Sequence, residues 1–85
     1  MTTPPDIERW LLLYLAVLGG EPVEALDPHA PLSLHDLDSF DAVQMSVELT
    51  RAYGVSVEPE FFLDGARSIA EAAAAIRPYL GDGGA

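Results

Sequence analysis

Proline and glycine divide this chain into helix-length segments, and no other feature limits its possible folds as strongly. Pro22, Pro28 and Pro31 all lie within residues 21–38. A proline inside a helix removes a hydrogen bond and clashes with the preceding turn, so this stretch is predicted to be a long loop. Around it, apolar residues recur at helical spacing. The pattern predicts an all-α four-helix bundle, with a long loop between the first two helices and a short third helix.

The first helix is predicted to have both ends marked. Thr3 can cap it, Pro4 suits its first position, and Gly19 and Gly20 supply a stop. Its core-facing residues are predicted to be Ile7, Trp10, Leu11, Tyr14, Val17 and Leu18.

Three more helices are predicted after the loop. They are expected to span residues 39–53, 59–64 and 68–79. Ser68 and Glu71 have the spacing of a capping box, which marks the start of the last one. Residues 55–57 alternate like a strand but are too short and have no partner strand.

Length and composition predict one small domain over residues 1–85, with flexible ends at 1–3 and 81–85. The chain has no cysteine, so neither disulfides nor a cysteine-based zinc site can stabilise it. Side-chain packing must therefore hold the fold together.

The charge balance is strongly acidic, with a formal net charge of −10. Such a surface repels nucleic acid and anionic membranes and attracts proteins with basic docking patches, although acidity also serves solubility alone. The apolar run 10–18 is too short to span a bilayer and follows acidic residues rather than a basic segment. We expect a cytoplasmic monomer.

Polar residues gather where the second helix is predicted to begin. Asp38 or Ser39 can accept hydrogen bonds from its free N–H groups, and Asp41 lies near the positive end of the helix dipole. Capping alone would account for all three residues.

The second helix also carries apolar residues on two sides. The stripe expected to face the core comprises Ala42, Met45, Leu49, Ala52 and Tyr53. The outer stripe comprises Phe40, Val43 and Val47, flanked by Asp41, Gln44, Glu48 and Arg51. Either the long loop covers the outer stripe, or it is a partner-docking surface beside Ser39.

Motifs along most of the chain resemble those of the phosphopantetheine-attachment family, the acyl and peptidyl carrier proteins. That family has Asp-Ser-Leu at the start of its second helix, then a Phe/Tyr-Gly stop, an Ile/Val-x-Ile/Val-Pro-like stretch and a final helix opened by Thr/Ser-Val/Ile. The matching segments are Asp38-Ser39-Phe40, Tyr53-Gly54-Val55, Val57-Glu58-Pro59 and Ser68-Ile69. The resemblance extends from Ile7 to Leu80.

The resemblance implies a carrier that performs no catalysis itself. It implies that a phosphopantetheinyl transferase attaches 4′-phosphopantetheine to Ser39 in a magnesium-dependent step, and that Asp38 helps to hold the transferase's metal ion. The arm's thiol would carry acyl or aminoacyl groups as thioesters, and the helix N-terminus suits the phosphodiester's charge. Implied partners are loading ligases, synthases and tailoring enzymes. The implied partner-facing residues are Phe40, Asp41, Val43, Gln44 and Val47.

Several residues depart from the family pattern. Phe40 replaces the usual Leu, and Asp36 stands where a glycine is common, which suggests that the backbone there needs no positive φ. Fatty-acid carriers usually have acidic residues at the positions of Gln44, Thr50, Arg51 and Ala52. These departures favour a discrete carrier of polyketide or nonribosomal peptide biosynthesis, including antibiotic pathways.

Other functions are weighed against this one. A small acidic adaptor could bind partners through Phe40, Val43 and Val47 without a prosthetic group. A hydrolase pairing His35 with Ser39 lacks a nucleophile-elbow motif and room for a pocket. A metal site is conceivable at Asp27, His29, His35, Asp36 and Asp38, but the spacing matches no zinc finger or EF-hand, and a solvated loop is favoured.

Overall fold

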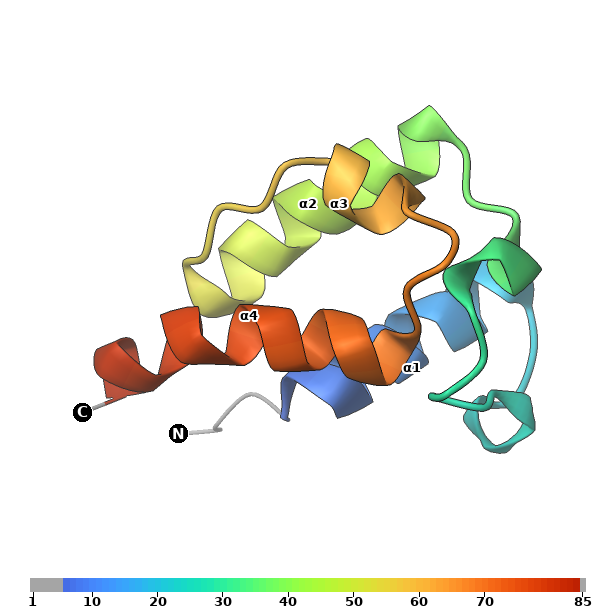
Figure 1. Cartoon of the computed structure of the whole chain (residues 1–85), viewed down its shortest axis with the longest axis horizontal. Coiled ribbons are helices and arrows are strands. Elements are labelled where there is room, and N and C mark those ends of the chain that lie inside the picture. The colour runs from blue at the N-terminus through green and yellow to red at the C-terminus, as the bar shows by residue number, and fades with distance from the viewer. Residues whose placement is uncertain (1–5, 85) are drawn as a thin grey trace.

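Four α-helices and two short 3₁₀-helices follow one another along the chain (Figure 1). The computed structural model describes residues 6–84, with side chains described through Leu80. The elements are α1 (Ile7–Gly19), η1 (Val23–Ala25), η2 (Leu32–His35), α2 (Ser39–Tyr53), α3 (Glu60–Leu63) and α4 (Ile69–Gly84). No strand occurs within residues 6–84, so the predicted all-α fold, with its long first loop and short third helix, is confirmed. No helix in this described part is long and apolar enough to cross a membrane.

The core lies between the four helices. Its buried side chains include Ile7, Leu11 and Leu15 from α1, Ala42, Met45 and Leu49 from α2, Phe62 from α3, and Ile69, Ala73 and Ile76 from α4. The inner stripe predicted for α2 is therefore buried along Ala42, Met45 and Leu49, whereas Tyr53 is only partly buried. Side-chain packing of this kind is the main source of stability in a domain without cross-links.

The predicted core face of α1 is partly wrong. Ile7 and Leu11 are buried, but Val17 is 83% exposed and Leu18 is 44% exposed. The reason is the orientation of α1 against α4, which runs in front of it in Figure 1. That packing buries Leu15 and Ala16 in place of Val17 and Leu18.

The ends of α1 and α4 also differ from the prediction. Asp6 caps α1 by accepting a hydrogen bond from the Glu8 N–H at 3.0 Å, whereas Thr3 and Pro4 lie outside the described residues. The backbone of α4 continues past Pro78 to Gly84, beyond the predicted end near Tyr79. A proline therefore costs this helix a hydrogen bond without ending it. The flexible end expected at residues 1–3 falls outside the described residues.

The predicted capping box at the start of α4 is confirmed. The Ser68 hydroxyl accepts from the Glu71 N–H at 3.0 Å, and the Glu71 carboxylate accepts from the Ser68 N–H at 2.8 Å. This closure fixes the chain direction where the connection after α3 enters α4.

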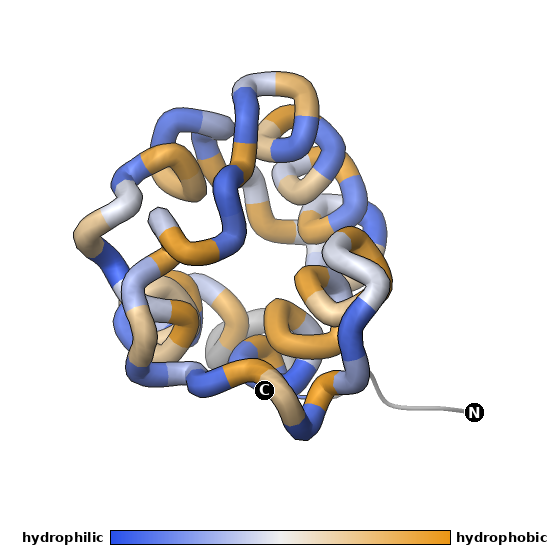
Figure 2. The backbone as a smooth tube through the Cα atoms, turned by 90° about the vertical axis from the view of Figure 1, so that its right-hand side faces the viewer, coloured by the Kyte–Doolittle hydropathy of each residue, from blue (hydrophilic) through white to orange (hydrophobic). Residues whose placement is uncertain are grey.

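The long loop is held by backbone hydrogen bonds to the connection between α3 and α4. The Leu32 N–H donates to Arg67 O at 2.8 Å and the Ser33 N–H to Gly65 O at 3.1 Å. The Ala70 N–H donates to Pro28 O at 2.9 Å. Both segments lie at the same end of the molecule in Figure 1, and Figure 2 views that end, where hydrophobic and hydrophilic residues intersperse along the tube. This docking places the start of α2.

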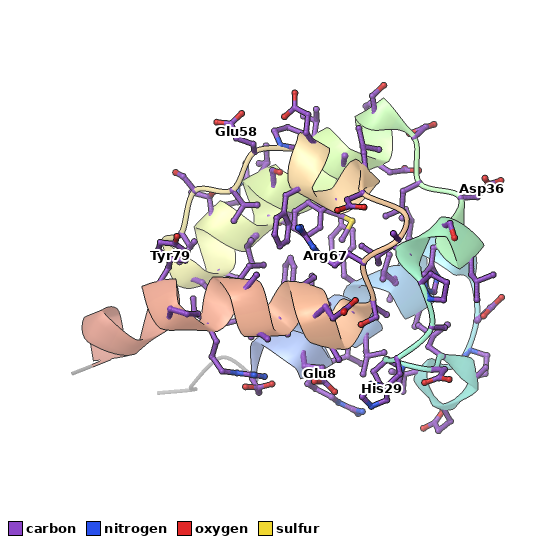
Figure 3. All side chains as sticks on the ribbon, viewed as in Figure 1. Glu8, His29, Asp36, Glu58, Arg67 and Tyr79 are labelled. Atoms are coloured by element: carbon purple, nitrogen blue, oxygen red, sulfur yellow. The ribbon has the colours of Figure 1, made fainter. Side chains whose placement is uncertain are left out.

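Two close contacts hold the connection between α3 and α4 in place. A Cβ added to Gly65 would lie 3.0 Å from the Ser33 Cβ, so glycine permits the close approach of the loop. The Arg67 guanidinium lies 4.1 Å from the centre of the Phe61 ring and donates to Phe61 O at 3.3 Å. Figure 3 shows Arg67 between α3 and α4.

Candidate functional site at the start of α2

The first turn of α2 is closed by two aspartates. Asp38 Oδ1 accepts from the Asp41 N–H at 2.8 Å, and Asp41 Oδ2 accepts from the Asp38 N–H at 3.3 Å. Each carboxylate thus satisfies a backbone donor that the helix start leaves free. Asp38, and not Ser39, is therefore the N-cap.

Ser39 has no structural role in that cap. It is the first residue of α2, its side chain is exposed, and its hydroxyl makes no hydrogen bond to the described residues. It stands at the end of α2 that carries partial positive charge. The capping explanation thus accounts for Asp38 and Asp41 but leaves Ser39 unexplained.

The surroundings of Ser39 are acidic. Asp36, Asp38 and Asp41 all lie within three residues of it, and Asp36 and Asp38 are exposed. These charges work against the attraction of the helix N-terminus for a phosphate, and a divalent cation bound beside them would screen the repulsion. Asp38 Oδ2 makes no hydrogen bond to the described residues and is open to such an ion. The site therefore fits attachment of a phosphodiester to Ser39 with the help of a metal ion.

Asp36 turns the chain toward α2, and one prediction about it is wrong. Its φ of 55° and ψ of 43° are left-handed, and its N–H donates to Ser33 O at 3.3 Å. The sequence suggested that no positive φ was needed here, because the residue is not glycine. Aspartate is among the few other residues that adopt this conformation at modest cost. Figure 3 shows Asp36 at the outer edge of the molecule.

The outer stripe of α2 is exposed. Phe40 is 71% exposed, Val43 46% and Val47 42%. The long loop does not cover them: its Leu26, Leu32 and Leu37 pack toward the core. Leu34, the remaining leucine of the loop, is exposed and does not cover them either. Of the two explanations for the outer stripe, coverage by the loop is therefore wrong.

The polar residues beside the outer stripe are weakly charged as a group. Gln44 is exposed, Asp41 is half-buried, and Glu48 lies 3.8 Å from Arg51. Arg51 is largely exposed and Glu48 is partly exposed, so this ion pair contributes little to stability. Thr50 is turned to the backbone and donates to Ser46 O at 3.0 Å and to Val55 O at 2.9 Å.

No hydrogen bond among the described residues joins His35 to Ser39. His35 lines a pocket of about 260 Å³ with Leu15, Leu18, Leu37 and Asp41, and Ser39 is not part of its lining. Among the described residues, no three histidine, aspartate or glutamate side chains gather as metal ligands, so the five residues weighed as a metal site do not converge.

Comparison with known proteins gives one match. The family model described as "Phosphopantetheine attachment site" matches residues 9–76, which is well over half of the chain. No curated protein and no solved structure matches the chain. The matched range includes the capped start of α2 and ends inside α4.

Proposed function

This chain belongs to the phosphopantetheine attachment site family, the acyl and peptidyl carrier proteins, and from that membership we propose that Ser39 is the residue that bears the arm. Members of the family are non-catalytic carriers with 4′-phosphopantetheine on a serine. A phosphopantetheinyl transferase modifies them, and acyl-handling enzymes use them. The bound arm supplies a terminal thiol that holds acyl groups as thioesters.

The free hydroxyl of Ser39 carries the proposal. The chain has five serines. Ser46 and Ser68 are buried, and Ser33 and Ser56 are exposed but lie outside the α-helices. Ser39 alone combines exposure with a place at the start of a long helix, where the backbone N–H groups favour a bound phosphate.

The chemistry needs little from this chain. The Ser39 oxygen forms a bond to a phosphorus of coenzyme A as the bond inside its pyrophosphate breaks. The nucleotide leaves with the electron pair, and the serine proton passes to a base of the transferase or to water. In the proposed complex, Asp38 Oδ2 contacts the transferase's magnesium ion, while Oδ1 keeps the cap in place.

Intact mass spectrometry tests the assignment. The protein is incubated with coenzyme A, magnesium and a broad-specificity phosphopantetheinyl transferase. We expect a mass gain of one phosphopantetheine group, absent in Ser39→Ala and retained in the matched control Ser33→Ala, which removes an exposed hydroxyl nearby. A gain that survives in Ser39→Ala would refute the assignment to Ser39.

The outer stripe of α2 is proposed to be the surface that presents the arm to partner enzymes. Phe40, Val43 and Val47 are exposed apolar side chains next to Ser39, and Asp41 and Gln44 border them. Val47→Asp should slow transfer of cargo between the modified protein and a partner enzyme without unfolding it, because the side chain is already partly in solvent. Ala74→Asp, at an exposed position of α4, tests whether added charge alone has this effect.

The departures on α2 support a place in polyketide or nonribosomal peptide biosynthesis. Gln44, Thr50 and Arg51 are exposed, so the helix offers few carboxylates to a partner that recognises charge. We therefore expect the modified protein to be loaded more slowly than a fatty-acid carrier by the malonyl transferase of a fatty-acid synthase. Equal rates would argue for a role in fatty-acid synthesis.

A further inference from the structure

Helix α1 has a second apolar side that the described structure covers only in part: Trp10 and Tyr14 are half-buried, and the rest of this side is exposed. Trp10, Leu13, Tyr14 and Val17 follow the spacing i, i+3, i+4, i+7, and Leu18 lies beside them. We call these five residues the α1 row. Val17 is 83% exposed, Leu18 44% and Leu13 38%. The neighbouring side of α1 supplies Ile7, Leu11 and Leu15 to the core, and Trp10 and Tyr14 pack against that core in part. The exposed members of the row, Leu13, Val17 and Leu18, are not explained by core packing.

The α1 row has a defined shape. The Trp10 and Tyr14 rings are stacked with their centres 5.3 Å apart, and the Tyr53 ring meets Trp10 edge-on at 5.9 Å. The five side chains of the row line a shallow apolar groove of about 360 Å³. Aromatic side chains that neighbours hold in place lose little freedom when a partner binds, which is typical of side chains that dominate an interface.

The border of the α1 row toward α2 is acidic. Burial raises the pKa of Tyr14, and the charges of Glu48 and Asp41 raise it further, so both carboxylates act on that ring. Glu21 follows the C-terminal end of the helix. The basic residues nearby are Arg9, one turn before Leu13, and Arg51, which pairs with Glu48 at 3.8 Å. Against the net charge of −10, these two cations leave a negative field.

We propose that the α1 row is a second docking surface, which binds a basic amphipathic helix of a partner protein. A row at helical spacing complements a similarly spaced aliphatic row on another helix. Lysine or arginine beside that partner row would meet Asp41, Glu48 and Glu21. A second copy of this chain fits less well, because two surfaces of the same negative charge repel each other. The inference goes beyond the carrier role and does not depend on Ser39.

The α1 row lies on a different side of the molecule from the outer stripe of α2, so the two surfaces can bind different partners. Asp41 and Glu48 project from α2 toward α1, whereas Phe40, Val43 and Val47 lie on another side of α2. A partner seated on the α1 row would therefore leave Phe40, Val43 and Val47 open, while it shares Asp41 at the border between the two surfaces. The protein could stay bound to one partner while other enzymes act at the start of α2.

The test uses a synthetic helical peptide of leucine and lysine with leucines at i, i+3, i+4 and i+7. A scrambled peptide of the same composition is the control. Trp10 is the only tryptophan, so its fluorescence reports binding, and backbone amide NMR shifts locate it. We expect the amphipathic peptide to shift amides of α1 and the scrambled peptide to bind at least about tenfold more weakly, because it cannot bury a continuous apolar row.

Two variants separate the surfaces. Val17→Asp should weaken peptide binding at least about tenfold, even though the added negative charge would by itself attract the basic peptide. Val17→Ser should also weaken peptide binding, and it does so without changing the charge of the surface. Val47→Asp should leave peptide binding unchanged. Circular dichroism checks that each variant is folded, as expected for side chains that are exposed.

Several outcomes would overturn the proposal. They are loss of binding in Val47→Asp but not in Val17→Asp, equal binding of both peptides, or amide shifts confined to α2. A dimer in sedimentation that Val17→Asp converts to a monomer would assign the α1 row to a second copy instead. Val17→Asp should still gain phosphopantetheine, and Ser39→Ala should still bind the peptide. Failure of this proposal is thereby distinguishable from failure of the attachment site.

Discussion

Arg77 holds Asp6 at the start of α1 from across the bundle, donating to its two carboxylate oxygens at 3.0 and 3.4 Å. The residues are 71 positions apart, so this contact joins α4 to the cap of the first helix. It lies at the opposite end of α1 from the docked loop. Because both side chains are about half exposed, the pair is expected to stabilise the fold only modestly.

The Asp6–Arg77 contact predicts a dependence of stability on pH. The hydrogen bond from Arg77 holds the pKa of Asp6 below its ordinary value of 3.8, and partial burial opposes this effect. A lowered carboxylate pKa means that the stabilisation is complete above the ordinary value and is lost as pH falls through the folded-state value. Asp6→Asn should therefore cost at most about 1 kcal/mol at pH 7 and progressively less below pH 4. Thermal melts of both proteins from pH 7 to pH 2.5 measure this, and an equal difference at every pH would contradict it.

The assignment of Asp38 as the α2 cap predicts that substituting Asp38 lowers stability, whereas substituting its neighbour Ser39 has little effect on stability. Asp38→Ala removes the acceptor for the Asp41 N–H and should lower the free energy of unfolding by about 1 kcal/mol. Ser39→Ala should change it by less than about 0.5 kcal/mol, since an exposed hydroxyl without a hydrogen bond is lost. Urea unfolding followed by circular dichroism compares them. If Ser39→Ala were the more damaging change, Ser39 would be the cap.

The close approach of Gly65 to Ser33 predicts a cost for a single methyl group. Gly65→Ala should destabilise the protein by about 1–2 kcal/mol, because the new Cβ meets the Ser33 Cβ at 3.0 Å and pushes the loop away. Gly19→Ala is the matched control, since no atom lies within 4 Å of an added Cβ there. Denaturant unfolding measures the free energy of unfolding of Gly65→Ala and Gly19→Ala for comparison. Equal effects would mean that the loop is not pressed against this connection.

Two buried serines make a matched pair. The Ser46 hydroxyl is buried and has no hydrogen-bond partner among the described residues, so Ser46→Ala should raise the free energy of unfolding by about 1 kcal/mol. The Ser68 hydroxyl accepts from the Glu71 N–H, so Ser68→Ala should lower it by about the same amount. Denaturant unfolding of the two variants in the same buffer measures both changes in the free energy of unfolding, the expected increase and the expected decrease. A loss of stability in Ser46→Ala would point to an unseen partner for that hydroxyl.

Much of the fold could be predicted because local chemistry determines it. Three prolines made the long loop, glycines ended α1 and α2, and the capping box of Ser68 and Glu71 opened α4. The start of α2 was predictable for the same reason, although only the structure shows that Asp38 and not Ser39 is the cap.

Features that depend on tertiary packing could not be predicted. Apolar residues surround most of α1, so periodicity could not decide which side α4 would bury, and Val17 was assigned to the wrong side. Leu18 was assigned to the core for the same reason. The left-handed backbone at Asp36 reflects how η2 must turn into α2, which the identity of one residue does not reveal.

The docking of the loop through its backbone has a consequence for sequence variation. Pro28, Leu32 and Ser33 are held through their main-chain atoms, and only Leu32 also contributes a buried side chain. The exposed side chains of the loop that serve in no core contact, cap or turn, such as Glu24 and His29, are therefore free to change without altering where α2 begins. A lineage could diversify these positions to suit new enzymes, and an engineer could randomise them, while the presentation of Ser39 stays constant.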